Sequence, residues 1–267
     1  MASDTALHDG RGRSQAWLRG PWALILGTLL LVLVCWTLVV PPPAALRSLW
    51  TWTPALLRGL WANIQISVLA MALGTAVGLV IGALLLTPNR VLRGAAGLWV
   101  QAFRNAPVLV LVYFTTYVFP FELALLRWTV PFPDWVKVVL GLALPASANV
   151  AEIFRGAIQS IPSAQWEAAQ SLALRRRQVF RLIVLPQCLR RMLPPWMNLY
   201  ASITMSTSLA SLVGVHDVVD TAQVASNTVA RTDFTILVYF TLLVLFFAYC
   251  YPIARATRAL ERRHERH

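Results

Sequence analysis

The sequence predicts an all-α integral membrane protein with about six transmembrane helices. Of its 267 residues, 58% are hydrophobic and only 13% are charged, and the mean hydropathy is +0.63. Such a composition leaves too little polar surface to cover a soluble globule of this length. Apolar runs also recur at the length of about 20 residues that crosses the hydrocarbon core of a bilayer. The six runs are residues 21–40, 60–86, 98–119, 135–153, 193–213 and 234–253.

The first run could be a cleavable signal, because Arg11, Arg13 and Arg19 precede it. Its length, and its end at three prolines without a clear small-residue cleavage site, favour a retained anchor instead. These boundaries predict four parts: a cytoplasmic tail at 1–20, an extra transmembrane helix with a connector at 21–58, a transmembrane domain at 59–255 with a cytoplasmic coupling segment at 160–190, and a basic cytoplasmic tail at 256–267.

The second run carries Gly74, Gly78 and Gly82 at four-residue intervals. This spacing puts a smooth stripe on one helix face, where another helix can approach closely. Further along, prolines bracket a predicted outer loop between the third and fourth runs. Residues 215–233 are polar, and we expect an outer loop or a partial helix near the membrane surface there.

The formal net charge of +12 raises the question of a nucleic-acid partner. The positions of the cations decide against one. If the N-terminus is cytoplasmic, most of the 23 lysines and arginines fall on the cytoplasmic side, and this asymmetry fits the positive-inside rule with both termini in the cytoplasm. The outer side holds only Arg47, Arg58, Arg127, Lys137 and Arg231.

No motif indicates catalysis or a bound cofactor. The phosphate-binding loops GxxxxGK[ST] and GxGxxG are absent, so any ATP must be bound by a partner. His216 stands alone in an outer segment, where a structural or solvated role is the simpler interpretation. The three cysteines are odd in number and far apart, which supports neither a disulfide framework nor a metal site. We therefore expect no enzyme, no cofactor and no metal in this chain.

The segment at 160–190 is charged and amphipathic, and it lies between two membrane-length runs. Ile161 and Pro162 turn the chain, and residues 165–172 form a predicted short helix with Glu167 near its positive N-terminal end. A second amphipathic stretch follows, with Val179, Phe180, Ile183 and Val184 toward protein or lipid. On periodicity alone, two interpretations remain open: a docking site for a partner, or an ordinary basic loop at the membrane surface.

Three ordered blocks add a resemblance. They are Phe103-Arg-Asn-Ala-Pro-Val-Leu109, Ala151-Glu-Ile-Phe-Arg-Gly156 running to Ile161-Pro162, and Glu167-Ala-Ala169 running to Leu185-Pro-Gln187 and Leu193-Pro-Pro195. Together with Thr207-Ser-Leu209, their order resembles the permeases of polar-amino-acid ABC importers, the binding-protein-dependent family with an EAA motif. The similarity extends from about residue 57 to the C-terminus.

The resemblance implies the type I ABC importer permease fold in a bacterial cytoplasmic (inner) membrane. It implies import of an amino acid or a related small polar solute, driven by ATP and Mg²⁺ in a separate ATPase dimer. The other implied partners are a periplasmic or extracellular solute-binding protein, a second permease of identical or paralogous sequence, and membrane lipid. The residues implied to couple the chain to the ATPase are Glu167, Ala168, Ala169, Ala173 and Leu174.

The chain departs from the family pattern at several places, among them Leu111, where many relatives carry Gln. Where relatives commonly have Gly, Ala173 makes the expected turn either right-handed or left-handed with some strain. Asn105-Ala106 replaces a frequent Gly-Thr, and Met205-Ser206 replaces a frequent Lys-Asp, so the substrate can differ from the usual charged amino acids. The substrate-pathway residues implied by the resemblance are Asn105, Ala106, Asn149, Met205, Ser206, Thr207 and Ser208.

Polar side chains at membrane depth normally face protein or water, but each has an alternative role. The hydroxyls can bond to their own helix carbonyls. Glu152 and Arg155, three residues apart on a helix, can pair with each other. Arg104 can extend to a lipid headgroup.

Two other function classes are alternatives to the importer. A secondary transporter or channel that works alone would show inverted repeats and several buried charges, and no internal repeat is evident. A membrane-embedded enzyme would need clustered His, Asp, Glu or Ser near one membrane face. The sequence names neither the solute nor the choice between a homodimer and a heterodimer of permeases.

Overall fold

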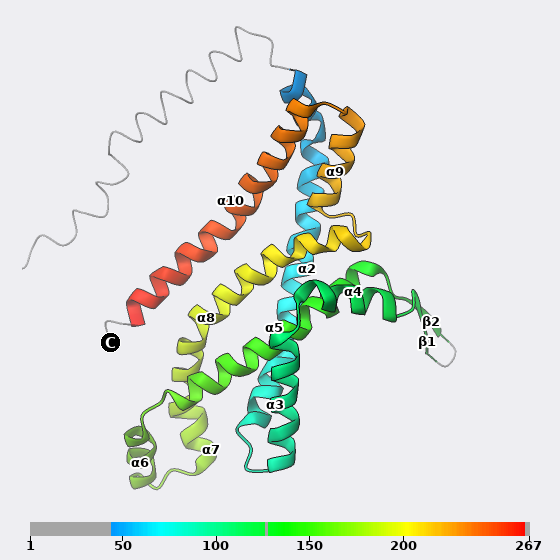
Figure 1. Ribbon diagram of the computed structural model, residues 1–267. Coiled ribbons are helices and arrows are strands. Elements are labelled where there is room, and N and C mark those ends of the chain that lie inside the picture. Colours follow the sequence, from blue (N-terminus) through cyan, green and yellow to red (C-terminus); the bar gives the residue numbers. More distant parts are fainter. Residues whose placement is uncertain (1–43, 126–127, 265–267) are drawn as a thin grey trace, which may run out of the picture. The chain divides into compact units, whose positions relative to one another are not determined.

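The computed structural model describes residues 44–125 and 128–264. The chain separates into a unit at 1–48 and a unit at 49–267, and the elements discussed below belong to the second unit except for residues 44–48, the start of the first described helix. Figure 1 shows that its described residues are almost entirely helical, as the sequence predicts. The predicted first span at 21–40 and the tail at 1–20 lie outside the described residues.

Three helices in the described part of the chain are long and apolar enough to cross a membrane: α2 (Ala44–Leu85), α5 (Asp134–Gln159) and α10 (Thr232–His264), the last over Thr232–Leu260. They contain the predicted runs at 135–153 and 234–253, and the run at 60–86 except for its last residue. The pair α3 (Arg90–Asn105) and α4 (Val108–Val118) meets the same criterion jointly, which gives up to four spans.

A sharp bend corrects the prediction of one continuous run at 98–119. Helices α3 and α4 meet at an angle of 104°. The break falls at Ala106 and Pro107, where Ala106 has an extended backbone with ψ 135°. Proline has no N–H to donate, and its ring disfavours the helical conformation in the residue before it. The sequence Asn-Ala-Pro therefore ends one helix and begins the next.

Two further helices differ from the predicted limits. Helix α2 begins at Ala44 and continues through Pro54, so part of the predicted connector is helical. Helix α8 (Leu185–Ser206) begins before the predicted run at 193–213 and is followed by the 3₁₀ helix η2 (Thr207–Val213). It is not among the helices apolar enough to cross a membrane, and it carries Arg190 and Arg191.

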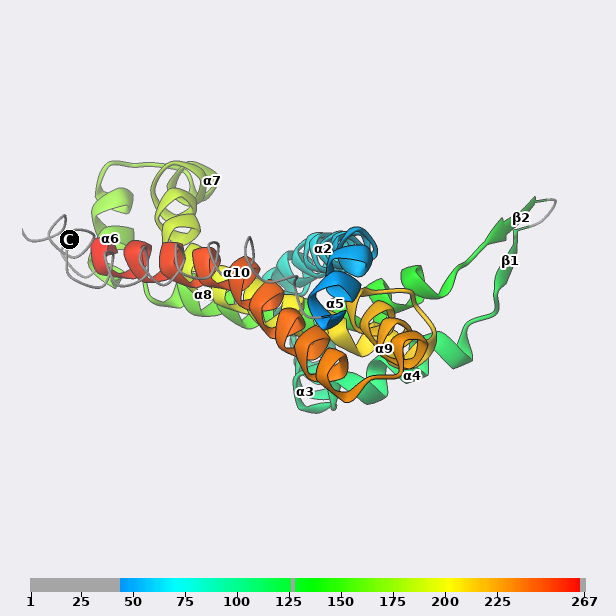
Figure 2. The same cartoon turned by 90° about the horizontal axis from the view of Figure 1, so that it is seen from above.

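The predicted outer loop between the third and fourth runs contains a small sheet that the all-α prediction did not include. Strand β1 (Glu122–Leu125) pairs antiparallel with β2 (Trp128–Pro131), with Glu122 opposite Pro131 and Leu125 opposite Trp128. Figure 2 shows this hairpin extending away from the helices to which it is joined.

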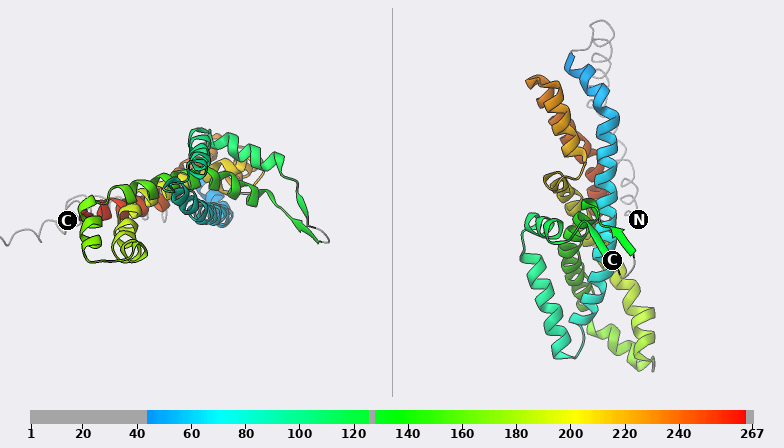
Figure 3. Two further views of the ribbon diagram at one scale, coloured as in Figure 1. Left: turned by 90° about the horizontal axis from the view of Figure 1, so that it is seen from below. Right: turned by 90° about the vertical axis from the view of Figure 1, so that its right-hand side faces the viewer.

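The glycine stripe of α2 packs against α5, as the spacing predicts. A Cβ added at Gly74 would lie 2.6 Å from the Ala146 Cβ, and one at Gly78 would lie 2.6 Å from the Ser147 carbonyl oxygen. Only a residue without a side chain allows this approach. Helix α5 also contacts α3, α4, α8 and η2 (Figure 3). Of the residues in the most apolar stretch of α5, 67% are buried, whereas 11% are buried in the corresponding stretch of α10. Helix α5 is therefore the central helix of the unit.

The remaining described elements connect these helices. They are α6 (Ser163–Ser171), α7 (Arg176–Val179) and the π-helix η1 (Phe180–Val184) between α5 and α8, and α9 (Val218–Val229) between η2 and α10. Helix α6 begins two residues before the predicted helix at 165–172 and ends one residue before it, and α9 agrees with the second of the two alternatives expected in residues 215–233, a partial helix.

Candidate functional site

Helix α6 is anchored through one face to the ends of α5 and α8. Ala169 is 1% exposed, in a cluster that includes Ile161 from the preceding turn, Val184 from η1 and Met192 from α8. Trp166 also packs against this cluster. A small residue at position 169 allows the backbone of α6 to lie close to its neighbours, and this packing anchors α6 on the ends of α5 and α8.

Two polar contacts fix the segment further. The Gln187 side-chain amide on α8 donates to the Gln165 carbonyl oxygen at 2.6 Å. Arg191 of α8 donates to the Ser160 hydroxyl at 2.7 Å and also to the Ser160 backbone carbonyl. These contacts connect α8 to the first turns of α6 and to the end of α5.

The opposite face of α6 is open. Glu167 and Ala168 are exposed, and the Leu172 side chain just beyond the helix is 72% exposed. The Glu167 carboxylate has no hydrogen bond or ion pair with any described residue. Three exposed arginines at 175–177 follow. The segment therefore presents an unpaired acid, a small residue and an apolar side chain on a fixed support.

The turn after α6 is left-handed at Ala173, with φ 54°. The Leu174 N–H donates to the Ala169 carbonyl at 3.3 Å across this turn. Of the two conformations that the sequence left open, the chain adopts the strained one, at a cost of about 1 kcal/mol relative to glycine.

A polar pocket of about 480 Å³ lies between α5 and α8. It brings together two of the predicted pathway residues, Asn149 from α5 and Met205 from α8. Asn198 and Ser202, which the sequence marks as polar at membrane depth, lie beside them. The full lining in the described part of the chain is Asn149, Ile153, Pro195, Asn198, Leu199, Ser202 and Met205.

Two polar groups in this pocket, on Asn198 and Ser202, make no hydrogen bond to the described residues, whereas that of Asn149 does. Asn149 uses its amide N–H on the Pro145 carbonyl at 2.8 Å. The Asn198 amide and the Ser202 hydroxyl have no hydrogen-bond partner among the described residues. They are four residues apart on α8 and therefore share one helix face.

Three other predicted pathway residues, Ser206, Thr207 and Ser208, do not line this pocket. Ser206 donates to the Ser202 carbonyl at 3.0 Å and Ser208 to the Met205 carbonyl at 2.9 Å. Thr207 is fully buried and donates to the Thr204 carbonyl at 2.7 Å. The alternative role, bonding to their own helix, therefore describes all three hydroxyls.

Asn105 lies in a second pocket, of about 360 Å³, between α3 and α5. Arg104, Glu152 and Arg155 also line it. Glu152 accepts a hydrogen bond from Arg155 at 2.6 Å and lies 3.9 Å from Arg104. The predicted pairing of Glu152 with Arg155 is confirmed, and Ala106 occupies the bend beside this cluster.

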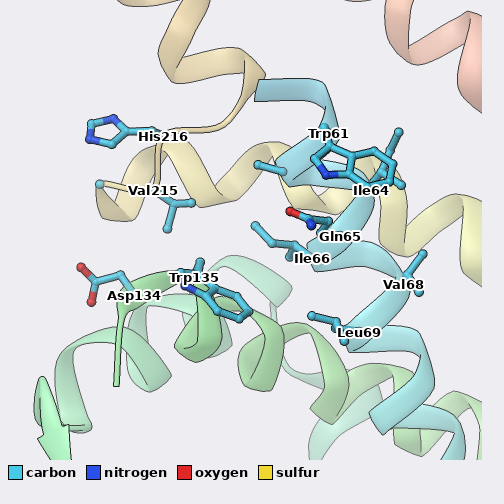
Figure 4. Close-up of a pocket in the computed structure, with 12 residues that line it drawn as sticks. Trp61, Ile64, Gln65, Ile66, Val68, Leu69, Asp134, Trp135, Val215 and His216 are labelled. Carbon is cyan, nitrogen blue, oxygen red and sulfur yellow. The ribbon is translucent and has the colours of Figure 1, made fainter. Parts of the chain in front are cut away.

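Sequence reasoning missed a third pocket, of about 720 Å³, between α2, the start of α5 and the turn at 214–216. Figure 4 shows Trp61 and Trp135 among its apolar side chains, with Asp134 and His216 directed away from them. The His216 ring lies 2.8 Å from the Asp220 carboxylate. Two tryptophans at the ends of apolar runs were the available signal, since this residue favours the membrane interface.

A fully buried polar cluster also escaped prediction. The Asn63 amide of α2 donates to Thr207 and to Asp217, each at 3.0 Å, and accepts from the Val218 N–H at 3.0 Å. Burial raises the pKa of Asp217 above its ordinary value, although the bonds from Asp220 N–H and Asn63 oppose this effect. A polar residue inside an apolar run was the only sequence signal for Asn63.

Lys137 forms a second buried contact near the start of α5. Its ammonium lies 3.0 Å from the Asp134 carboxylate and donates to the Thr116 carbonyl at 3.4 Å. It also lies 3.9 Å from the centre of the Phe121 ring. These contacts connect α4, the base of the hairpin and α5. Among the residues described, no group of three His, Cys, Asp or Glu is placed to hold a metal ion.

Comparison with known proteins gives consistent results. Residues 74–266 match the family model described as binding-protein-dependent transport system inner membrane component. The probable amino-acid ABC transporter permease YckA of Bacillus subtilis is 30% identical over 79% of this chain and 89% of its own length. The L-cystine permease TcyB of the same organism is 28% identical over 92% and 96%. An amino acid ABC transporter of known structure superposes with a TM-score of 0.71 at 24% identity, covering 81% of this chain and 97% of its own.

Proposed function

This chain belongs to the family of binding-protein-dependent transport system inner membrane components, and we propose that it is the permease subunit of an ABC importer for an amino acid or a related small polar solute. One observation carries the proposal. The exposed helix α6 is anchored to α5 and α8, and the same two helices form the polar pocket. A force on α6 would therefore act on both walls of a solute site.

A separate ATPase dimer supplies that force. It binds ATP and Mg²⁺, so this chain is a transport subunit and not itself the enzyme. The unpaired Glu167 carboxylate, Ala168 and the exposed Leu172 form the contact surface. Closure of the ATPase dimer displaces α6, and the buried Ala169 transmits the displacement because a rigid helix, unlike a mobile loop, passes on movement.

The family description supports a second partner, a solute-binding protein that delivers the solute from the outer side. In this orientation the cytoplasmic side holds the arginines of the coupling segment and those of the C-terminal part of α10. Both termini lie on the same side, in agreement with the positive-inside rule.

The outer surface of α10 supports the remaining partners, lipid and a second permease. Ile236, Phe240 and Leu243 are each more than 60% exposed. Such a continuous apolar face is stable only when hydrocarbon or another protein covers it. Whether the second permease is identical or paralogous depends on which genes are expressed with this one.

The test is purification of this chain from its native membrane in a mild detergent, with mass spectrometry of the proteins that accompany it. We expect an ATPase to accompany the unchanged chain and to be lost from Glu167→Lys. The matched control is Glu122→Lys, which makes the same change of charge on the exposed hairpin. ATP-driven uptake in proteoliposomes should follow the same order.

Two outcomes would contradict the proposal. If Glu167→Lys retained the ATPase and coupled uptake, the contact surface would lie elsewhere. If the unchanged chain were purified alone and catalysed uptake without ATP, it would be a secondary transporter or a channel.

A further inference from the structure

We infer that the pocket between α5 and α8 admits solutes whose side chains carry no charge, and that Asn198 and Met205 determine this selectivity. The inference rests on the proposed function and adds the substrate class. Its starting point is the lining, in which no described residue has a charged side chain. Every amino acid brings the same α-ammonium and α-carboxylate charges, so the lining can discriminate only through the side chain. A charged side chain finds no partner of opposite charge in this lining, whereas an uncharged polar side chain needs only hydrogen bonds.

The charges on the adjoining turn of α5 act against a cationic side chain in particular. Glu152 lies three residues after Asn149, but its carboxylate already pairs with Arg155 at 2.6 Å and approaches Arg104 at 3.9 Å. The cluster therefore holds one more positive than negative charge. It leaves no free carboxylate for a cationic side chain, and its positive excess repels one.

The groups that remain match an uncharged polar side chain. The side chains of Asn198 and Ser202 can each donate and accept hydrogen bonds. Neither side chain has a hydrogen-bond partner in the described part of the chain. Ile153 and Leu199 supply an apolar wall. Met205 is 54% exposed and adds a flexible thioether at the edge of the pocket. Side chains that end in an amide or a hydroxyl, such as those of glutamine and serine, fit this set.

Binding of radiolabelled glutamine to the purified transporter tests the inference. The sample contains this chain with its co-purifying subunits and no solute-binding protein, so that the selectivity of the binding protein does not enter. Unlabelled serine and asparagine should displace the label. Arginine and glutamate should displace it about tenfold more weakly, the ratio expected from a difference of about 1.4 kcal/mol in binding.

Two substitutions should shift the selectivity in opposite directions. Asn198→Asp supplies a carboxylate and should strengthen displacement by arginine about tenfold, while Met205→Lys should strengthen displacement by glutamate by a similar ratio. Asn227→Asp is the control, because Asn227 is exposed on α9 and is not part of the pocket lining.

Three results would overturn the inference: arginine or glutamate displacing glutamine as well as serine does, Asn198→Asp behaving like Asn227→Asp, or no saturable binding of glutamine while ATP-driven uptake proceeds. Each of these leaves the importer function intact. Failure of the function itself would appear separately, as a chain with no accompanying ATPase and no ATP-driven uptake of any amino acid.

Discussion

The two ends of the α5–α8 pair differ in the way they are held together. At the α6 end, the Arg191 contacts with Ser160 are exposed, Ala173 is strained, and Glu167 is exposed without a partner among the described residues. At the other end, Asn63 and Asp217 are fully buried and hydrogen-bonded. Among the residues described, no buried polar side-chain atom lacks a partner. On the proposed function, this difference predicts that a substitution at the α6 end alters coupling more than stability, whereas a substitution in the Asn63–Asp217 cluster alters stability most.

The backbone of α8 shows the same contrast at its two ends. The π-helix η1 precedes it and the 3₁₀ helix η2 follows it. Such departures from α-helical geometry occur where a helix can change its course. At the η2 end, Thr207 accepts a hydrogen bond from Asn63, whereas η1 lies within the coupling segment and its Leu182 is 64% exposed.

The largest effect on stability is expected in the buried Asn63–Asp217 cluster. Asn63→Leu would leave Asp217 and the Val218 N–H buried without their partner, at a cost of about 3 kcal/mol of unfolding free energy. The measurement is the unfolding transition of the purified chain in detergent. Gln65→Leu, two residues away and exposed, is the control and should change stability by less than about 0.5 kcal/mol. Equal losses of unfolding free energy in the two variants would mean that the hydrogen bonds of the buried cluster do not stabilise the chain.

At the coupling end, Ala169→Leu should have a smaller effect on stability and a larger one on coupling. The added atoms have no space in the cluster beneath α6, and overpacking of this kind costs about 2 kcal/mol. Because α6 is then displaced from its support, ATP hydrolysis should continue with little uptake. Ala164→Leu, at an exposed position of α6, should leave uptake unchanged. Coupled uptake at the normal rate in Ala169→Leu would argue against a rigid lever.

The buried cluster also predicts a dependence on pH. Since burial raises the pKa of Asp217, the folded chain holds the proton more tightly than the unfolded chain. The resulting stability is fully present below the ordinary value of 3.8 and is lost as the pH rises through the raised pKa. Asp217→Asn should remove this part of the pH dependence of the unfolding transition. An unchanged pH profile would show that the carboxylate titrates as it does in water.

The smallest effect is expected at the strained turn. Ala173→Gly should stabilise the chain by about 0.5 to 1 kcal/mol, because glycine adopts a positive φ without the Cβ penalty. Ala164→Gly, within α6, should destabilise it by a similar amount. The two variants are compared in one series of unfolding transitions, and the same sign in both would contradict the strained conformation.

Local patterns in the sequence predicted a large part of this architecture. The glycine stripe of α2, the short helix at 163–171 and the Glu152–Arg155 pair each depend on residues a few positions apart, so spacing alone identifies them. The α3–α4 bend was not predicted, although Pro107 is the local signal that marks it. The contact of Asn63 with Asp217 had no such local signal, because it joins residues 154 positions apart and depends on how α2 packs against η2 and α9.

The polar pocket lies between these extremes. The sequence marked Asn149 and Met205 as pathway residues, and the structure places them in one pocket with Asn198 and Ser202. The sequence could not separate these groups from Ser206, Thr207 and Ser208. The separation depends on which hydroxyls bond to their own helix, and that is determined by the helix face each residue occupies.

The central claim is that displacement of α6 reaches the pocket through α5 and α8. Its most direct test is the reactivity of the thiol introduced by Ser202→Cys, in a chain without its native cysteines, toward a membrane-impermeant maleimide. The complete transporter is compared in proteoliposomes without nucleotide and with nucleotide trapped by vanadate. We expect the reactivity to change severalfold between the two states, and Glu167→Lys to abolish the change. Equal reactivity in both states, while uptake remains driven by ATP, would contradict the account.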